Sequence, residues 1–438
     1  MGKLQGLKAG MIALGCVKNR VDSEQMLGML QKAGCQITGA PEEADLLIVN
    51  TCGFIASAKE ESIDAILEMA QHKKTGRCRL LCVTGCLAQR YEKELLAEIP
   101  EIDCLLGVSQ YADLIRHLEN ALTGDRPAAT ARQAGFLECG RVLTTPSYSA
   151  YIKIGDGCDN RCAYCAIPLI RGGYRSRPRE AILEEMRGLA GQGVKEHILI
   201  AQDTTRYGSD LGDSLESLMR DAADIPGVEW LRALYMYPDE LSERVLDVMA
   251  ARDNICKYLD LPLQHAAPEL LKKMNRRGEM AHVRAMLKGA RSRGFCLRTT
   301  FIVGFPGETE DDFKQLMDFT EEIGFDRMGA FAYSQEEDTP AAVMPGQIPE
   351  EEKQRRLDAL MQLQARISKE RNALRVGQEE RLLVCGKNGR NYAARSGWEA
   401  PDADGEILLR SARPLEIGSF VPARITGSSV YDLTAEAL

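Results

Sequence analysis

Six apolar segments of strand length recur between residues 148 and 345, and helical patterns follow most of them. The strand segments lie at 150–154, 197–201, 230–235, 258–263, 298–303 and 327–333, and the clearest helical patterns at 179–190, 281–293 and 310–323. Strands that alternate with helices pair in parallel, because each crossover returns the chain to the same end of the sheet. Six such units are fewer than the eight of a closed barrel. We therefore predict that residues 148–373 form an open (βα)6 partial TIM-like barrel, with a functional site at the carboxyl ends of its strands.

The first 125 residues show the same alternation on a smaller scale. Apolar runs at 11–14, 46–50 and 80–84 predict buried strands, and helical patterns at 22–33 and 57–72 lie between them. We expect residues 1–125 to form a parallel α/β domain. Residues 126–147 lack periodicity, so they are predicted to be a linker.

The pattern changes again after the predicted open barrel. One long charged helix is predicted at 348–374, where apolar side chains recur at helical spacing. After it, the runs RLLVCG, GEILLR, FVPARIT and VYDLTA are short and are separated by Gly, Pro and Asn. Short strands of this kind indicate a small β-barrel at residues 374–438. The fold class is therefore α/β with a carboxy-terminal β-barrel.

Three cysteines follow the first strand of the predicted open barrel with the spacing C-x3-C-x2-C. They are Cys158, Cys162 and Cys165, in the segment GDGCDNRCAYCAIPLIRG. A [4Fe–4S] cluster takes four thiolates. Three closely spaced thiolates leave one iron open, and an open iron can chelate the amino and carboxylate groups of S-adenosylmethionine, so the cofactor carries the radical chemistry. A zinc site is the alternative, but zinc sites usually show two paired groups of ligands, and no second pair follows nearby.

Polar or glycine residues at the ends of the predicted strands are candidates for binding S-adenosylmethionine. Residues at the carboxyl ends of barrel strands face one mouth, and glycines allow a close approach of the backbone to a ligand. The alternatives are a tight turn for the glycines and a structural role for the histidine. The candidates, together with the aromatic residue before the last cysteine of the run, are Tyr164, Gln202, Asp203, Gln264, His265, Gly304 and Gly307.

Three further cysteines each follow one of the apolar runs of the amino-terminal domain. Cys16 ends MIALGC, Cys52 ends LLIVNTC and Cys86 ends LLCVTGC. Equivalent ends of neighbouring parallel strands converge on one crevice, so three thiolates could meet there and hold a second cluster. The alternative is three buried small side chains, a common fate of cysteine. We expect that fate for other cysteines, namely Cys35, Cys82, Cys256, Cys296 and Cys385.

Over nearly its whole length the chain resembles the radical S-adenosylmethionine methylthiotransferases. The resemblance implies an amino-terminal methylthiotransferase domain, a radical core and a carboxy-terminal TRAM domain. It also implies two [4Fe–4S] clusters and S-adenosylmethionine as cofactors. The radical cluster is carried over onto Cys158, Cys162 and Cys165, and the auxiliary cluster, which carries the sulfur, onto Cys16, Cys52 and Cys86.

Four segments resemble the branch of that family that modifies an aspartate of small-subunit ribosomal protein twelve. They are LGCVKNRVDSE, IPLIRGGYRSRP, QDTTRYG and YSQEEDTPAA. The transfer-RNA branch typically has Gln-Met in place of Val17-Lys18, and it tends to have basic residues in place of Glu336, Glu337 and Asp338. The resemblance therefore implies methylthiolation of the β-carbon of an aspartate in a basic ribosomal protein, with an electron donor such as a flavodoxin.

Charge and composition agree with a protein substrate. The net charge is −9, and residues 375–438 carry eight basic and nine acidic side chains, which is unusual for a module that grips RNA. A plain solvated surface explains that balance equally well. The segments that would mark a signal peptide or a transmembrane helix are missing, and fourteen cysteines then indicate a reducing compartment, so we expect a cytoplasmic protein. The remaining alternatives are methylthiolation of an adenosine in transfer RNA and a non-catalytic iron–sulfur protein that binds ribosomes.

Overall fold

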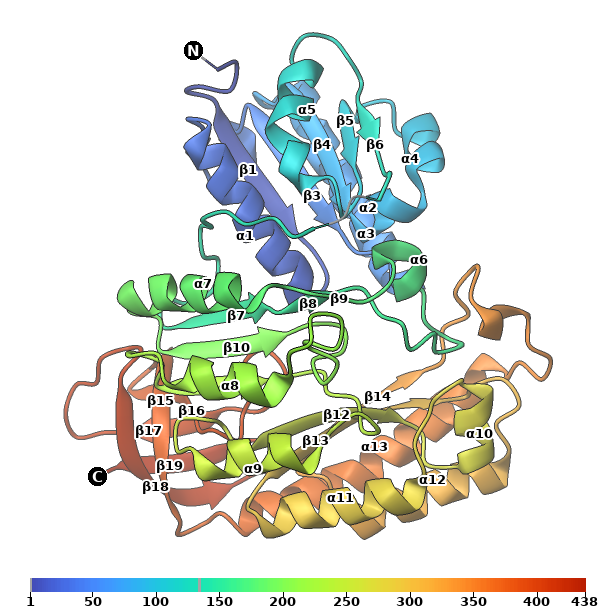
Figure 1. Cartoon of the computed structure of the whole chain (residues 1–438), viewed down its shortest axis with the longest axis vertical. Helices are drawn as coiled ribbons and strands as arrows, with labels where there is room; N and C mark the ends of the chain where they lie inside the picture. The colour runs from blue at the N-terminus through green and yellow to red at the C-terminus, as the bar shows by residue number, and fades with distance from the viewer. Residues whose placement is uncertain (1, 133–134) are drawn as a thin grey trace.

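A computed structural model describes residues 2–132 and 135–438 of the chain. The amino-terminal sheet stands at the top of Figure 1, the open barrel lies below it, and the small carboxy-terminal barrel lies at the lower left. The predicted fold class is confirmed in all three parts.

The amino-terminal part is one parallel sheet with the strand order β2-β1-β3-β4-β5-β6. Its strands are β1 (Lys8–Ala13), β2 (Gln36–Ile37), β3 (Leu46–Thr51), β4 (Leu80–Gly85), β5 (Cys104–Leu106) and β6 (Ala128–Ala129). Every residue of β3 and β4 is buried, because helices cover both faces of the sheet. Helices α1 (Val17–Lys32) and α5 (Leu114–Ala121) pack on one face, and α2 (Ala56–Thr75), α3 (Cys86–Arg90) and α4 (Glu92–Glu98) pack on the other.

The three predicted strands of this sheet are confirmed, but the sheet is wider than expected. Strand β5 has three residues and β6 has two, which is too short for a periodic pattern to show. Strand β6 lies in the segment that was expected to be only a linker. Ala128 and Ala129 pair with Leu105 and Leu106 of β5, so the linker begins as an edge strand of the sheet.

The open barrel contains all six predicted strands, in two parallel sheets that lie edge to edge. One has the order β11-β10-β7 and the other β12-β13-β14. The strands are β7 (Ser149–Lys153), β10 (Glu196–Ile200), β11 (Trp230–Ala233), β12 (Tyr258–Gln264), β13 (Cys296–Val303) and β14 (Arg327–Ala332). The N–H of Met236 donates to the carbonyl of Asp260 (3.0 Å), which joins the two sheets after β11 ends. Among the described residues β14 and β7 form no ladder, so the barrel is open.

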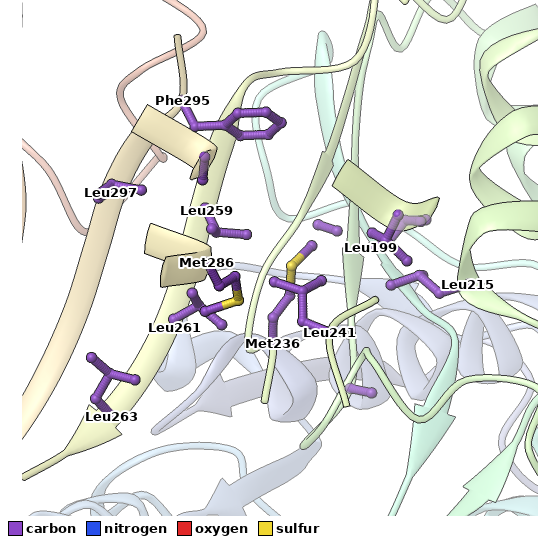
Figure 2. Close-up of a cluster of buried hydrophobic side chains, with 14 of the residues drawn as sticks. Leu199, Leu215, Met236, Leu241, Leu259, Leu261, Leu263, Met286, Phe295 and Leu297 are labelled. Atoms are coloured by element: carbon purple, nitrogen blue, oxygen red, sulfur yellow. The ribbon is translucent and has the colours of Figure 1, made fainter. Parts of the chain in front are cut away.

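Helices cover the outer face of the open barrel and bury its main apolar core. They are α7 (Arg179–Gly191), α8 (Leu215–Ala223), α9 (Glu243–Ala251), α10 (Pro268–Lys273), α11 (Met280–Ser292) and α12 (Glu310–Ile323). Figure 2 shows this core, where Leu199, Leu259 and Leu261 from the strands lie among Leu215 of α8 and Met286 of α11. This packing fixes the positions of the strand ends that carry the candidate site.

The long helix α13 (Glu350–Ala373) leads into a closed barrel of the order β15-β16-β17-β19-β18. Its strands are β15 (Glu379–Asn388), β16 (Asn391–Arg395), β17 (Ile407–Arg410), β18 (Phe420–Ser428) and β19 (Leu433–Ala437). Four of the five were predicted, and β16 was missed because the segment NYAAR has few residues that favour strands. None of the described helices combines the length and the apolar content that crossing a bilayer requires.

A buried ion-pair group attaches the closed barrel to the open one. Glu196 of β10 contacts Arg232 of β11 (3.3 Å) and Arg395 of β16 (2.6 Å). Burial would raise the pKa of Glu196, but Arg395 and Arg232 outweigh that effect and lower it from 4.5 to about 2. The group therefore contributes stability that is complete above about pH 4.5 and is lost as the pH falls toward 2.

A Glu196→Gln variant is expected to lose about 3 kcal/mol of unfolding free energy at neutral pH, because it leaves two arginines buried without a carboxylate. Urea unfolding followed by circular dichroism measures this loss. The difference from the parent protein should narrow below pH 4.5, and the exposed Glu184→Gln variant is the control. A difference that stays constant down to pH 3 would contradict this account of Glu196.

Candidate functional site

The first cysteine run lies in a loop at the carboxyl end of β7. A short hairpin, β8 (Gly155–Asp156) with β9 (Arg175–Ser176), encloses the loop, and α6 (Ile167–Arg171) follows it. The N–H of Cys158 donates to the carbonyl of Gly172 (3.1 Å), and the N–H of Ala163 donates to that of Met274 (2.8 Å). The backbone of the loop is thus held from two sides.

The thiols of Cys158, Cys162 and Cys165 interact electrostatically with one another. Burial raises the pKa of Cys158 to about 11 and that of Cys165 to about 12. Arg276 donates from Nη1 to Cys162 Sγ (3.7 Å) and lies 4.1 Å from the centre of the Tyr237 ring. Three soft donors backed by a buried guanidinium fit a cluster that carries negative charge, and its binding would release the thiol protons.

The donor set also argues against a single metal ion. Nowhere in the described ranges do three His, Cys, Asp or Glu side chains converge closely enough to hold one ion. A tetranuclear cluster binds each thiolate at a separate iron, so its ligands lie farther apart than those of one ion. Three thiols match the protein ligands of a [4Fe–4S] cluster that keeps one iron open.

Tyr164 lies within this loop, and Gln202 and Asp203 lie beside it and support it. Asp203 accepts a hydrogen bond from Asn160, inside the loop (2.8 Å), and Gln202 donates to Asp156 of the hairpin (3.1 Å). The Oε1 atom of Gln202 is buried without a partner among the described residues, so it is available to a ligand. Arg276 donates to the Tyr164 hydroxyl (3.4 Å).

The candidates at the ends of β12 and β13 make several hydrogen bonds, but His265 Nε2 and Glu308 Oε1 are buried without a hydrogen-bond partner among the described residues. His265 is fully buried, accepts from the N–H of Ala267 (3.1 Å), and lies 3.6 Å from Glu308. Glu308 accepts from the N–H groups of Gly304 and Phe305, and Gly307 donates to the carbonyl of Gly346 (2.8 Å).

Gly304 and Gln264 have left-handed backbones, with φ of +73° and +71°. A Cβ on Gly304 would lie 2.3 Å from Cγ of Lys353, so this glycine makes room for helix α13. Gln264 donates to the carbonyl of Pro262 (3.4 Å). These contacts hold the GFPGE turn and the end of β12 in place, and binding of S-adenosylmethionine there stays a prediction.

Cys16, Cys52 and Cys86 lie at one edge of the amino-terminal sheet, where β1, β3 and β4 end. Cys16 precedes α1, Cys52 follows β3, and Cys86 begins α3. A Cβ on Gly15, whose φ is +83°, would lie 2.9 Å from Cys52 Sγ, so only glycine lets these two turns approach so closely. Burial, with a smaller contribution from the nearby thiols of Cys16 and Cys52, raises the pKa of Cys86 to about 12, although Arg171 acts to lower it.

Asn19 connects the turns that carry these three cysteines. It donates to the carbonyls of Leu14 (3.1 Å) and Thr51 (2.9 Å), and the Cys86 thiol donates to its Oδ1 (3.7 Å). Three converging thiols of this kind again fit a cluster with an open iron.

Arg171 joins the two groups of cysteines. Its side chain is fully buried and donates to Asn19 (2.7 Å), Asp22 (3.0 Å) and Asp156 (3.1 Å). It ends helix α6, which follows the first cysteine run and shares a buried apolar cluster with Cys86. The two sites are therefore held in one rigid polar network.

A second group of ion pairs and hydrogen bonds joins the same two domains near Cys52 and Cys86. Glu336, in the loop after β14, is buried and contacts Lys59 of α2 (3.0 Å) and Arg90 of α3 (3.7 Å). Arg90 also donates to the carbonyls of Gly53 and Glu337 (both 3.0 Å).

Sequence reasoning did not select Asn19, Arg171 or Arg276. A signal for Asn19 could have been the polar sequence of α1, which is polar almost throughout. Most of these polar side chains are buried, because α1 lies between two domains. Arg276 has no such signal, since it approaches Cys162 from more than a hundred residues away.

Three family models match the chain in succession. Residues 8–107 match Uncharacterized protein family UPF0004, residues 152–320 match the Radical SAM superfamily, and residues 376–438 match the TRAM domain. The second match implies a [4Fe–4S] cluster and S-adenosylmethionine for the barrel.

Curated relatives match at full length. A protein of Pelotomaculum thermopropionicum is 50% identical over 99% of this chain and 100% of its own length. One of Desulforamulus reducens is 49% identical over 98% of both chains, and one of Clostridioides difficile is 47% identical over 99% of both. All three are named ribosomal protein uS12 methylthiotransferase RimO.

Solved structures share the fold. The radical S-adenosylmethionine methyltransferase TsrM from Kitasatospora setae, with cobalamin and a [4Fe–4S] cluster bound, aligns with a TM-score of 0.57. The alignment covers 77% of each chain at 16% sequence identity.

Proposed function

The chain belongs to the family of ribosomal protein uS12 methylthiotransferases, and we propose that it transfers a methylthio group to the β-carbon of an aspartate in uS12. The observation that carries the proposal is the pair of cysteine groups, held together by Arg171, in a chain whose curated relatives match at full length. A β C–H bond has no proton acidic enough for ordinary acid–base catalysis, so a radical route is required.

We propose that Cys158, Cys162 and Cys165 hold one cluster, which also binds S-adenosylmethionine. Cys16, Cys52 and Cys86 would hold the second. When bound, these groups supply the radical and the sulfur that amino-acid side chains cannot.

The chain's own contribution is to position these groups and to exclude water. Arg276 stabilises negative charge at Cys162, and Tyr164 packs beside it. The network of Arg171 holds both cysteine groups in register, which reduces the reorganisation that transfer between them would need. Burial of Cys52, Cys86 and Cys162 keeps water away from that side of the site.

We also propose a division of labour along the chain and a cellular setting. Residues 1–125 would serve the sulfur-bearing cluster, 148–373 the radical chemistry and 374–438 the docking of uS12, with 126–147 as the connection. A flavodoxin-type protein would supply the electron. Because the proposed substrate is a ribosomal protein, we place the reaction in the cytoplasm.

Mass spectrometry of both candidate substrates tests the proposal. The anaerobically reconstituted enzyme, S-adenosylmethionine and a reductant are incubated with purified uS12 or with total transfer RNA, and each is then digested. We expect a methylthio group on one aspartate of uS12 and none on transfer RNA. The modification on an adenosine instead would establish the transfer-RNA reaction, and turnover of neither substrate nor S-adenosylmethionine would favour a non-catalytic protein.

A further inference from the structure

Lys18 is a buried ammonium group beside the second group of cysteines. It lies in the first turn of α1, two residues after Cys16, and only 6% of it is exposed. Its Nζ lies 3.0 Å from the centre of the Tyr235 ring. Within the described ranges it makes no hydrogen bond and no ion pair, so its three N–H donors are unused.

A charge in this position is unfavourable unless something pairs with it. Burying an ammonium costs free energy, and a cation–π contact offsets only part of that cost. The nearby carboxylates already have other partners. Asp260 accepts from Arg298 (2.7 Å), Asp22 is held by Arg171 and Lys153, and Asp156 by Arg171. The free protein therefore holds a cation near Cys16 whose carboxylate partner is missing.

The tyrosine whose ring contacts Lys18 has a strained backbone. Tyr235 lies two residues after the end of β11 and has a left-handed backbone, at φ +62°. Its N–H donates to Asp260 (2.9 Å), and its carbonyl accepts from Thr204 (3.0 Å). Strain of this kind persists only where surrounding contacts enforce it, and it is common at binding sites.

A cavity borders Tyr235 and Val17, the residue that precedes Lys18. Val17, Tyr235 and Asp260 line a cavity of about 120 Å³. It shares the lining residues Tyr151 and Asp402 with a larger cavity of about 410 Å³ between the open barrel and the closed barrel. A segment of a docked protein could therefore reach Val17 and Tyr235, which adjoin Lys18, from the direction of the closed barrel.

We propose that Lys18 binds the side-chain carboxylate of the substrate aspartate and is the residue that selects aspartate over asparagine. This inference rests on the proposed function. The β-carbon is bonded to the carboxyl carbon, so a carboxylate held at Lys18 keeps the reacting carbon close to Cys16. Three ammonium donors suit an anion, whereas the neutral amide of asparagine offers no charge in return.

The test measures how tightly the reconstituted holoenzyme binds two forms of uS12. One carries the target aspartate and the other carries asparagine in its place, and binding is followed by fluorescence anisotropy under anaerobic conditions. The parent enzyme is expected to bind the aspartate form about 10- to 100-fold more tightly, the usual range for a hydrogen bond to a charged group. In a Lys18→Met variant that ratio should fall close to one.

Lys32→Met is the matched control, because Lys32 is the last residue of the same helix and is exposed. It should keep the aspartate preference of the parent. Iron content is measured for each variant, so that a loss of cluster is detected separately.

Three outcomes would overturn the inference. They are a parent enzyme that binds both forms equally, a Lys18→Met variant that keeps both the affinities and the aspartate preference of the parent, and a variant that keeps this preference while it loses affinity for both forms by the same factor. The last would assign Lys18 to the cluster rather than to the substrate. The first needs no variant, so the inference can be tested even if Lys18→Met fails to fold. A parent enzyme that never modifies uS12 would instead contradict the proposed function.

Discussion

A Cys162→Ala variant is expected to form almost no 5′-deoxyadenosine from S-adenosylmethionine in an anaerobic assay with a reductant. Cys162 is the most buried thiol of its loop and the one to which Arg276 donates. Removing it leaves two of the three proposed ligands. Loss of a supporting residue around a metal site already costs about 10- to 100-fold, so loss of a ligand should reduce turnover to below about 1% of the parent rate.

Cys139→Ala is the control for removal of a thiol. Cys139 is exposed and lies outside both groups of cysteines, so its variant should cleave S-adenosylmethionine at the parent rate. Chromatography of the nucleoside product gives the rate for each protein. Normal 5′-deoxyadenosine formation by Cys162→Ala would mean that the run does not hold the radical cluster.

A Cys52→Ala variant is expected to separate the two halves of the reaction. The variant should still cleave S-adenosylmethionine within about threefold of the parent rate, because Cys52 is not a proposed ligand of the radical cluster. Its removal also leaves the hydrogen bonds of Arg171 to Asn19 and Asp156 in place. It should transfer no methylthio group to uS12, since the sulfur-bearing cluster would lack a ligand. Product analysis by mass spectrometry and the iron content of the same preparation check both parts.

The iron content gives a second, independent readout for this variant. Two [4Fe–4S] clusters correspond to about eight irons per chain, and one cluster to about four. Cys82→Ala is the matched control, because Cys82 is a fully buried thiol in the interior of β4, next to Cys104 of β5. It should retain about eight irons. If Cys52→Ala also retained eight irons and thiolated uS12 normally, the second cluster would have to lie elsewhere.

Local sequence patterns predicted most of the fold because the interactions that form each element are local. Helix α12 illustrates this, since it begins and ends at the predicted residues 310 and 323. Thr309 and Asp312 form a capping box at its start, and Gly324 ends it with a left-handed backbone. The six barrel strands were predicted for the same kind of reason, because buried apolar runs are visible within a few residues.

Elements and contacts that depend on distant partners could not be predicted from the sequence. Strand β6 exists only because β5 offers an edge to two alanines, and nothing in 126–147 indicates that edge. Lys353, which is far away in the sequence, fills the space that a Cβ on Gly304 would need, and no local pattern indicates this contact. Such contacts cannot be read from spacing along the chain.

The candidate site likewise has residues that the sequence predicts and contacts that only the tertiary structure shows. The sequence alone determined the cysteines, because C-x3-C-x2-C spacing lies within eight residues and because Cys16, Cys52 and Cys86 each follow an apolar strand. The tertiary structure decided how the two groups are joined. Arg171 contacts Asn19 across 152 positions of the chain, and Lys18 lies over Tyr235. Burial strengthens the interactions of these charges and raises the cost of leaving them unpaired. It is a property of the packed domains rather than of any local segment.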